Sequence, residues 1–337
     1  MECFLKCYFE QFTNLPRNSL HDRRKRKAMV QYISTLIQGC SAVEPTVEES
    51  SRIAIKTILN YHDEMRDQNG TVCLMGKNHN ILYVAMKLCF DWQVQDLAIV
   101  SLLLEQIYLC EKTFERILIG AIFGNKAPHY IAGWKSDFET EEENVRAVVY
   151  FLDKATNAAL ELPFTVANEE RLFRFVDVPI ESCGRASPLK ICVQLGIPDK
   201  LHIFLRFGAR LYTENEEFNV FEHILNRLSE FNHKYPYNLI ACLQLLLRAA
   251  PWIKIKPKDF TEEEEKILYE RLLEKYADLV DDGIVPLSRC GLTPPELKHL
   301  CRCVIREKLW ENYQLPSGIR SLPVPEQMWK YLDLLED

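Results

Sequence analysis

The sequence contains no run of about eighteen apolar residues, the shortest stretch that crosses a bilayer as a helix. Its start, Met1 to Lys6, also lacks the long apolar stretch of a secretory signal peptide. We therefore expect an intracellular protein without a membrane partner, located in the cytoplasm or, as the alternative, in the nucleus. Twelve cysteines at irregular spacing in such a chain are expected to be reduced thiols.

Motifs that mark most enzymes are missing as well. There is no phosphate-binding loop, no Gly-x-Ser-x-Gly segment, no pair of catalytic carboxylates and no Cys-His signature. A zinc site from Cys290, His299, Cys301 and Cys303 is disfavoured, because one helix cannot bring side chains at different angles together and no second ligand pair is present. We predict a non-catalytic protein that needs no cofactor and no metal.

The net charge of −7 argues against wholesale binding of nucleic acid. One basic run, Arg23 to Lys27, stands out locally, and two interpretations of it remain open. It is either a nuclear-import signal or the solvated face of a helix. We favour the helix, because the run leads directly into the apolar periodicity of Met29, Ile33 and Leu36.

Residues 187–209 resemble an ankyrin repeat. Ser187, Pro188 and Leu189 stand for the Thr-Pro-Leu of the repeat signature, with Ser187 as the helix cap. Gly196 and Gly208 stand where the turn between two short helices and the end of the second helix need positive φ.

Weaker copies of the pattern surround this repeat. They comprise Leu82 and Ala85 with Val100, Leu103 and Leu104; Leu118 and Ala121 with Val148, Phe151 and Leu152; and Phe221 and Ile224 with Leu243, Leu246 and Leu247. A single repeat cannot bury its apolar face, so several must stack. We expect about four or five repeats in an all-α solenoid. Since 47% of the 337 residues are hydrophobic, the chain can bury a core that extends along such an array.

Helices are also predicted on both sides of the repeats. Residues 1–74 contain a capping box at Thr46 to Glu49 and a turn at Gln68 to Gly70, and they cap the array or form part of a substrate site. Thr261 to Glu265 is a capping Thr with acids in the first turn of a helix that continues to Asp282 and Gly283. This second helix is expected to close the array.

Two long spacers interrupt the repeats. Residues 124–143 are predicted to be an insertion with aromatic side chains beside acidic residues, and two interpretations of them remain open. In one, Tyr130, Trp134 and Phe138 are exposed and bind a protein substrate. The alternative is that these side chains fold back on a repeat. Residues 156–185 are expected to fold locally.

The C-terminal region begins with a second capping box, Thr293 to Glu296, and an apolar stripe at spacings of three and four. The stripe consists of Leu297, Leu300, Cys301, Val304, Ile305 and Leu309. About forty residues cannot bury such a stripe in a core of their own. It therefore needs a partner surface, on another protein or on a neighbouring domain.

A proline-bounded segment follows this stripe. Each proline of Leu322 to Pro325 fixes its own φ and lacks an amide hydrogen, so the segment is held extended at little ordering cost. Ile319 precedes this segment, and Tyr331 and Leu332 follow it.

The order and separation of these two elements resemble a SOCS box. In that family a Leu, a Cys four residues later and a small aliphatic residue four further on insert into elongin C, and Leu297, Cys301 and Ile305 match them. Glu296 stands where the family has Ser, Thr or Pro. The implied elongin-C-binding residues are Leu297, Leu300, Cys301, Val304 and Ile305. The implied cullin-binding residues are Ile319, Leu322, Pro323, Val324, Pro325, Tyr331 and Leu332.

Together the repeats and the tail resemble the ankyrin-repeat and SOCS-box family. The resemblance implies an all-α ankyrin solenoid followed by a three-helix SOCS box. The predicted parts are a helical N-terminal region (1–74), divergent repeats (75–255), a closing helix and joint (256–285) and the box (286–337).

The function that the family implies is recruitment of an unknown protein substrate to a ubiquitin ligase of elongin B, elongin C, cullin-5 and its RING subunit. The alternative is an ankyrin interaction scaffold without ligase function.

Overall fold

The computed structural model describes residues 2–9, 20–41, 46–70, 79–127, 131, 136–166, 169–212, 219–253, 267, 270–271, 273–291 and 293–337. These residues fold into two compact units, Met1–Arg185 and Ala186–Asp337. The boundary falls inside the range predicted for the repeats. No helix in the described part of the chain is both long enough and apolar enough to cross a membrane.

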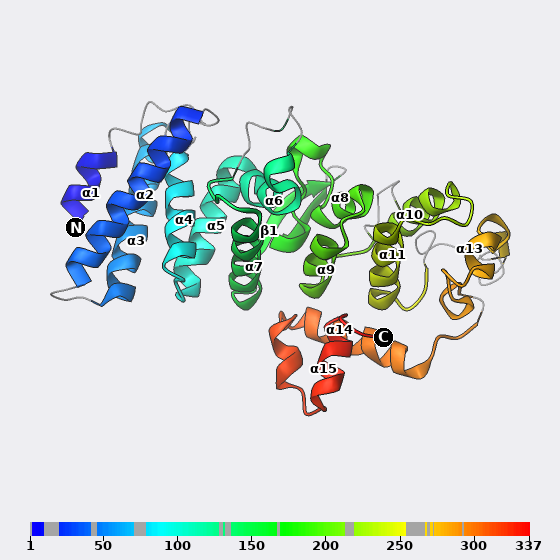
Figure 1. Ribbon diagram of the computed structural model, residues 1–337. Coiled ribbons are helices and arrows are strands. Elements are labelled where there is room, and N and C mark those ends of the chain that lie inside the picture. Colours follow the sequence, from blue (N-terminus) through cyan, green and yellow to red (C-terminus); the bar gives the residue numbers. More distant parts are fainter. Residues whose placement is uncertain are drawn as a thin grey trace. The chain divides into compact units, whose positions relative to one another are not determined.

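The first unit is mostly helical (Figure 1). Its helices are α1 (Glu2–Phe9), α2 (Leu20–Ser41), α3 (Val47–Gln68), α4 (Asn80–Asp91), α5 (Leu97–Glu111), α6 (Glu115–Phe123), η2 (Gly124–Lys126) and α7 (Glu141–Asn157). Strands β1 (Glu161–Val166) and β2 (Glu169–Arg174) follow, with the short turns η4 (Phe175–Asp177) and η5 (Glu181–Cys183).

Local signals in the N-terminal region are confirmed. The Thr46 hydroxyl accepts a hydrogen bond from the Glu49 amide, as an N-cap does, so α3 begins where the capping box predicts. The same helix ends at Gln68, and Gly70 has a φ of +70°. The predicted turn therefore lies at the predicted place.

The predicted weak repeats of this unit are helix pairs. Helices α4 and α5 form one pair, and α6 and α7 form the next. The residues that carried the pattern are all buried: Leu82, Ala85, Val100, Leu103, Leu104, Leu118, Ala121, Val148, Phe151 and Leu152. The apolar faces of successive pairs therefore supply one another with a core, as stacking requires.

The spacer after α7 folds locally, but as a β-hairpin. Strands β1 and β2 pair antiparallel, with Leu162 opposite Phe173 and Phe164 opposite Arg171. The side chains of Leu162, Phe164 and Phe173 are buried, whereas those at Glu161, Pro163 and Thr165 are exposed. This alternation is typical of a strand with one buried face, and it adds a small sheet to the expected all-α unit.

The basic run lies at the start of α2, as the helix interpretation predicts, but it is not wholly solvated. Arg26 is only 3% exposed. Its Nε and Nη2 each lie 2.8 Å from a carboxylate oxygen of Asp137, and Nη1 lies 2.7 Å from Asn80 Oδ1. A buried charge is tolerated only when it is paired in this way, so Arg26 is a structural residue.

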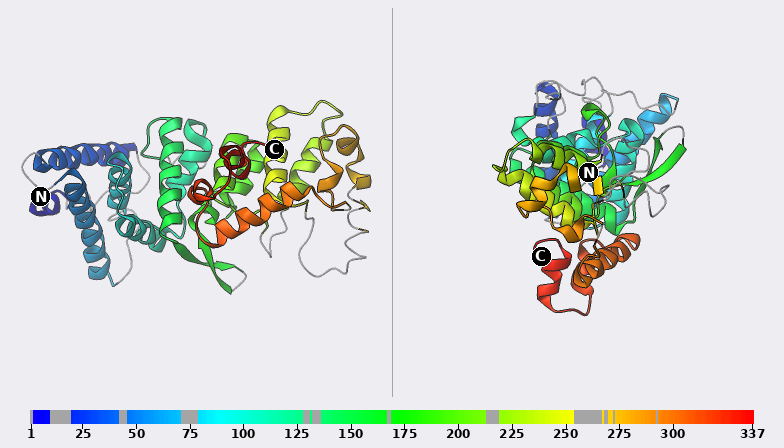
Figure 2. Two further views of the ribbon diagram at one scale, coloured as in Figure 1. Left: turned by 90° about the horizontal axis from the view of Figure 1, so that it is seen from below. Right: turned by 90° about the vertical axis from the view of Figure 1, so that its right-hand side faces the viewer.

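The second unit contains two further helix pairs, α8 (Pro188–Leu195) with α9 (Pro198–Arg206) and α10 (Val220–Ser229) with α11 (Tyr237–Ala249). The remaining elements are α13 (Ala277–Asp281), η6 (Leu287–Arg289), α14 (Leu297–Glu311), η7 (Ser317–Ser321) and α15 (Glu326–Leu332). Helices α14 and α15 pack against each other (Figure 1, Figure 2).

The strong repeat is built as its sequence predicts. The Ser187 hydroxyl accepts a hydrogen bond from the Lys190 amide, and Pro188 is the first residue of α8. Gly196 has a φ of +66° and Gly208 a φ of +78°. Phe221, Ile224, Leu243, Leu246 and Leu247, from the next copy, are buried.

The closing helix is interrupted. Thr261 to Glu265 lie outside the described residues, so the predicted cap stays a prediction. Further along, Tyr276 stands outside helical geometry and α13 begins only at Ala277. The Tyr276 hydroxyl donates to Asn226 Oδ1 over 2.6 Å, which ties this break to α10. The helix does end at Asp281, just before Asp282 and Gly283, as expected.

Candidate functional site

Helix α14 has its polar face turned inward. His299 and Arg302 are each 2% exposed and Arg306 is 7% exposed. On the other face Leu297 is 76% exposed and Val304 54% exposed. This is the reverse of an ordinary surface helix, in which the apolar stripe faces the core.

His299 fixes the first turn of the helix to the end of the last helix pair. Its Nε2 lies 2.8 Å from the carbonyl oxygen of Ala250, and its Nδ1 lies 2.9 Å from Arg302 Nη2. A carbonyl only accepts and a guanidinium only donates, so Nε2 carries the proton and the ring is neutral. Burial holds the pKa of His299 below its usual value, which agrees with this assignment.

Arg306 connects three elements of the unit. Its Nη2 donates to the carbonyl oxygen of Leu205 over 2.6 Å, and its Nη1 donates to that of Leu332 over 2.8 Å. Burial lowers the pKa of Arg306 to about 10, so the guanidinium remains charged at neutral pH. The side chain therefore links α14 to the end of α9 and the end of α15.

The C-terminal residues form a second set of anchors. Asp333 accepts from Arg206 Nε over 2.8 Å and from Nη2 over 2.7 Å, in a two-pronged ion pair. Asp337 is held in the same way by Arg248, over 2.9 and 2.7 Å. Because a two-pronged ion pair fixes the orientation of both side chains as well as their distance, the C-terminal residues from Asp333 to Asp337 are held in one orientation against α9 and α11.

Behind these anchors the C-terminal elements share a small apolar core. Leu309, Leu315, Ile319 and Leu332 are its buried members. The partly buried residues packed against it are Ile305, Trp310, Leu322, Val324 and Trp329. This core holds α14, η7 and α15 together as one folded piece.

The residues predicted to bind elongin C lie mostly on the outer face of α14. Leu297, Cys301 and Val304 are exposed, and Leu300 is half-buried. Ile305 lies at the edge of the stripe and packs against the small core. Within the described part of the chain, no other element covers Leu297 or Val304, which leaves an apolar surface open to solvent.

The residues predicted to bind a cullin divide into two groups. Ile319, Tyr331 and Leu332 are buried, and Leu322 and Val324 are half-buried against the small core. Pro323 and Pro325 are exposed on the segment between η7 and α15. This segment is not extended throughout, as predicted, because it turns at Pro323, where the Val324 amide donates to the Leu322 carbonyl oxygen over 2.8 Å. The buried and half-buried residues hold the segment against the small core, whereas the two prolines lie where a partner protein can reach them.

The predicted capping box at the start of α14 is wrong. The helix begins at Leu297 with Glu296 as N-cap, and no side chain caps it. The Glu296 carboxylate instead accepts from Arg289 Nη1 over 2.6 Å and from the Ser288 hydroxyl over 3.1 Å. The hydrogen bond from Arg289 lowers the pKa of Glu296 to about 2. Competition from this arginine explains the failed prediction.

The predicted substrate-binding aromatics are only partly described. Tyr130 and Trp134 lie outside the described residues, and their role stays a prediction. Phe138 is 4% exposed, and its ring meets that of Phe90 edge-on with centroids 5.2 Å apart. The premise of exposure is therefore wrong for Phe138, which folds back on a repeat as the alternative proposed.

Sequence reasoning missed the anchoring residues. Nothing in the sequence marked Arg206, Arg248, Arg302 or Arg306 as anchors, and His299 was considered only as a possible zinc ligand. Three of them recur at spacings of three and four along α14, on the side opposite the apolar stripe. That periodicity was the only signal available. Among the described residues, no group of three or more His, Cys, Asp or Glu side chains is arranged to hold a metal ion.

Lowering the pH is expected to weaken the second unit through His299. Because the folded pKa is depressed, the unfolded chain binds more protons below its own pKa of about 6.5, and folding stability falls there by up to about 1.4 kcal/mol per pH unit. Arg289, Arg302 and Glu296 are the charged groups that act on the ring, and the Cys303 thiol lies 3.6 Å from its Nε2. Urea unfolding at pH values from about 7.5 to about 5.5 measures this slope. A His299→Gln variant with an unchanged slope would contradict the assignment.

Gly208→Ala is expected to loosen α14 from the repeats. A Cβ at Gly208 would lie 2.4 Å from Trp310 Cδ1, and the φ of +78° disfavours any L side chain. Gly283→Ala is the matched control, because its φ is +71° and nothing lies within 4 Å of the added Cβ. We expect Gly283→Ala to lower the free energy of unfolding by about 1 kcal/mol and Gly208→Ala to lower it by at least about 1 kcal/mol more. Thermal unfolding of both variants measures the difference. Equal losses would mean that Trp310 moves aside freely.

Comparisons with known proteins agree with this arrangement. Residues 293–333 match the SOCS box family. Ankyrin repeat and SOCS box protein 17 of Canis lupus familiaris is 30% identical over 192 residues, which are 55% of this chain and 59% of that protein. The Bos taurus protein of the same name is 29% identical over 194 residues, which are 56% of this chain and 62% of that protein.

A third relative is similar over a short stretch only. The Homo sapiens protein of that name is 51% identical over 41 residues, which are 12% of this chain and 14% of that protein. The chain spans 59% and 62% of the lengths of the first two relatives. No solved structure matches it.

Proposed function

Since the chain belongs to the ankyrin repeat and SOCS box family, we propose that it is the substrate-recognition subunit of a cullin-based ubiquitin ligase. In this proposal elongin B and elongin C bind the box, cullin-5 and its RING subunit join through the proline-bounded segment from Leu322 to Pro325, and the repeats bind a protein substrate. We place this activity in the cytoplasm.

The exposed stripe of α14 is the observation that carries the proposal. Leu297 and Val304 are large apolar side chains, each more than half exposed, on a helix whose polar face is buried. Leaving apolar area in water costs about 25 cal/mol per Å², so this surface favours a protein partner. Elongin C is the partner that the SOCS box family suggests.

The proposed role needs no catalytic group in this chain. An adaptor raises the effective concentration of a substrate lysine near the ubiquitin-loaded enzyme, and the thioester chemistry belongs to other subunits. The adaptor must instead hold the substrate and the ligase in a fixed relative orientation. The two-pronged ion pairs of Asp333 and Asp337 give the box a fixed orientation within the second unit.

Co-expression of the full chain with elongin B and elongin C tests the proposal. After purification through this chain, all three proteins are expected to elute together. Absence of elongin from the eluate would favour the alternative function, an ankyrin scaffold that does not join a ligase. Addition of cullin-5 to the purified complex then tests the second step separately.

Replacing Pro323 and Pro325 together by Ala is expected to weaken cullin-5 binding alone. Both prolines are exposed. Leu322 (φ −71°, ψ 140°) and Pro325 (φ −56°, ψ 150°) have extended dihedrals, and between them the chain turns at Pro323, where the Val324 amide donates to the Leu322 carbonyl oxygen over 2.8 Å. Loss of two fixed φ angles costs about 1 to 2 kcal/mol of preorganisation, or about tenfold in affinity. Calorimetric titration of the elongin complex with cullin-5 measures it. A parallel loss of elongin would show that the two surfaces are not separate.

A further inference from the structure

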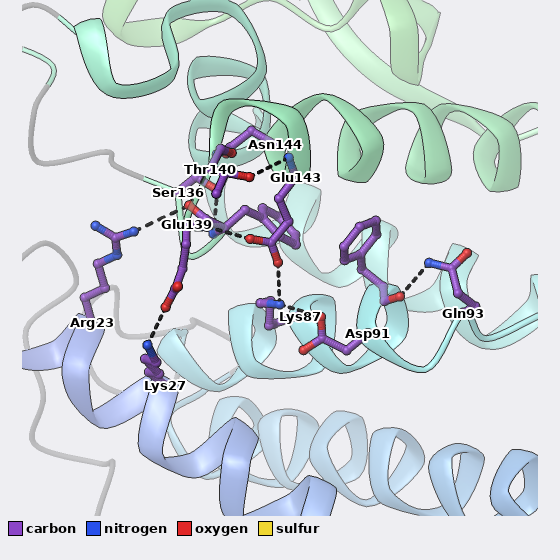
Figure 3. A network of polar contacts seen from close by, with 12 residues as sticks. Arg23, Lys27, Lys87, Asp91, Gln93, Ser136, Glu139, Thr140, Glu143 and Asn144 are labelled. Atoms are coloured by element: carbon purple, nitrogen blue, oxygen red, sulfur yellow. Dashed lines mark hydrogen bonds and ion pairs between the residues drawn. The ribbon is translucent and has the colours of Figure 1, made fainter.

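A cavity of about 690 Å³ lies in the first unit, between α2, α4 and the segment before α7. Figure 3 shows the polar groups around it: Arg23 and Lys27 come from α2, Lys87 and Asp91 from α4, and Glu139 and Glu143 from the opposite side. The site lies wholly within one unit, and neither the box nor the predicted aromatics accounts for it.

The carboxylates of this cavity are already neutralised. Asp137 forms a two-pronged ion pair with Arg26, at 2.8 Å for each contact. Glu139 pairs with Lys27, whose hydrogen bond lowers the pKa of Glu139. Lys87 lies between two carboxylates, bonded to Asp91 and at 2.8 Å from Glu143. Each acid in the wall therefore has a cation within ion-pair distance, and Asp91 and Glu143 share Lys87.

Two arginines of the wall are left over. Arg24 is exposed, and within the described part of the chain the Arg23 side chain donates one hydrogen bond, to the carbonyl oxygen of Phe138 over a long 3.5 Å. Among the described residues, no carboxylate lies within ion-pair distance of either guanidinium. Both side chains line the cavity, so it has a surplus of positive charge that can donate several hydrogen bonds.

We propose that this cavity binds an acidic segment of the substrate, whose oxyanion groups are held by Arg23 and Arg24. The inference rests on the proposed adaptor function, since it assigns part of the substrate surface. A guanidinium matches a carboxylate or a phosphate with two parallel N–H donors, so a Glu or Asp side chain and a phosphorylated side chain share the required chemistry.

The cavity is prepared for such a ligand. Arg26, 3% exposed, fixes one wall to the other through Asp137 and also donates to Asn80 on α4. Lys87 is positioned by its two carboxylates and lies 5.4 Å from the centre of the Phe138 ring. A wall held in this way loses little conformational entropy on binding. A rigid frame therefore surrounds two arginines that have no carboxylate of their own.

Fluorescence anisotropy with the full chain tests the site, using fluorescein-labelled hexaglutamate as the probe. We expect the wild type to bind it and the Arg23→Gln, Arg24→Gln double variant to bind at least about tenfold more weakly. Lys25→Gln with Lys56→Gln is the matched control. It removes the same charge from α2 and α3, outside the cavity, and should change the affinity less than about twofold.

Three results would overturn the inference. They are no binding of hexaglutamate by the wild type, equal losses in both double variants, and preferential binding of labelled hexalysine. A hexapeptide with one phosphoserine distinguishes the two sources of the oxyanion. If it binds more tightly than hexaglutamate and depends on the same arginines, the segment is a phosphorylated one, and the site stands.

Elongin co-elution of the Arg23→Gln, Arg24→Gln variant separates the two proposals. Retained elongin with lost hexaglutamate binding supports both. Absent elongin in wild type and variant alike, with hexaglutamate binding intact, would reject the adaptor function and leave an acidic-peptide site on an ankyrin scaffold.

Discussion

Replacing Leu297 and Cys301 together by Asp is expected to abolish elongin binding without unfolding the chain. Both residues are exposed on the outer face of α14, and Leu297 is 76% exposed. Substitutions at such positions change the free energy of unfolding by only about 0.5 kcal/mol. In a complex, however, each new carboxylate would lose its hydration against an apolar partner, and two central contacts together are worth at least about 4 kcal/mol. The affinity should therefore fall by about a thousandfold.

The control for this pair is Lys234→Asp. Lys234 is exposed in the turn after α10, and its replacement changes the net charge by the same amount as the two new carboxylates. Surface-plasmon titration with the elongin B and elongin C heterodimer compares the three proteins, and thermal unfolding checks their integrity. If Lys234→Asp lost elongin as completely, general electrostatics would explain the effect. If the double variant still bound, the stripe would not be the elongin surface.

The stacked repeats could be predicted because their signals are local. Ser187, Pro188, Gly196 and Gly208 each have one main physical use at their positions, in a cap, a first helical turn or a positive-φ turn, and all four are used in that way. The Thr46 cap of α3 belongs to the same class. The weak copies of the repeat could be recognised because the strong repeat gives the spacing at which their apolar residues are expected.

What the sequence could not supply were contacts between distant residues. The Thr293 capping box failed because Arg289 competes for Glu296, and Phe138 was misjudged because Phe90 and Lys87 enclose it. The hairpin after α7 alternates like a strand, but its six-residue strands are too short to stand out in a helical chain.

Only one side of the candidate site could be predicted from the sequence, for the same reason. Its apolar stripe shows a periodicity that one sequence reveals. Its buried polar side depends on carbonyl groups at Leu205, Ala250 and Leu332, which have no sequence signature. From the sequence alone the apolar stripe could face either another protein or a neighbouring domain, and nothing indicated that the polar side of the helix would be buried.

Arg26→Ala is expected to destabilise the first unit by about 3 to 5 kcal/mol. The substitution leaves Asp137, whose side chain is 13% exposed, with Arg116 at 3.6 Å as its ion-pair partner among the described residues, and it removes the hydrogen bond to Asn80. A largely buried carboxylate that keeps only this more distant partner costs more than the lost contact itself. Hydrogen exchange should show protection lost in α2 and α4 while α8 to α11 keep theirs.

Lys27→Ala shows whether burial, rather than charge alone, produces this effect. Lys27 is the next residue of the same helix and pairs with Glu139 of the same segment, but the side chains are 60% and 58% exposed. Exposed pairs contribute about 0 to 1 kcal/mol, so little protection should be lost. Equal exchange in the two variants would mean that the ion pair of Arg26 does not hold α2 to the segment before α7. In that case the Arg26–Asp137 ion pair would also not hold together the two walls of the cavity that we propose binds an acidic segment.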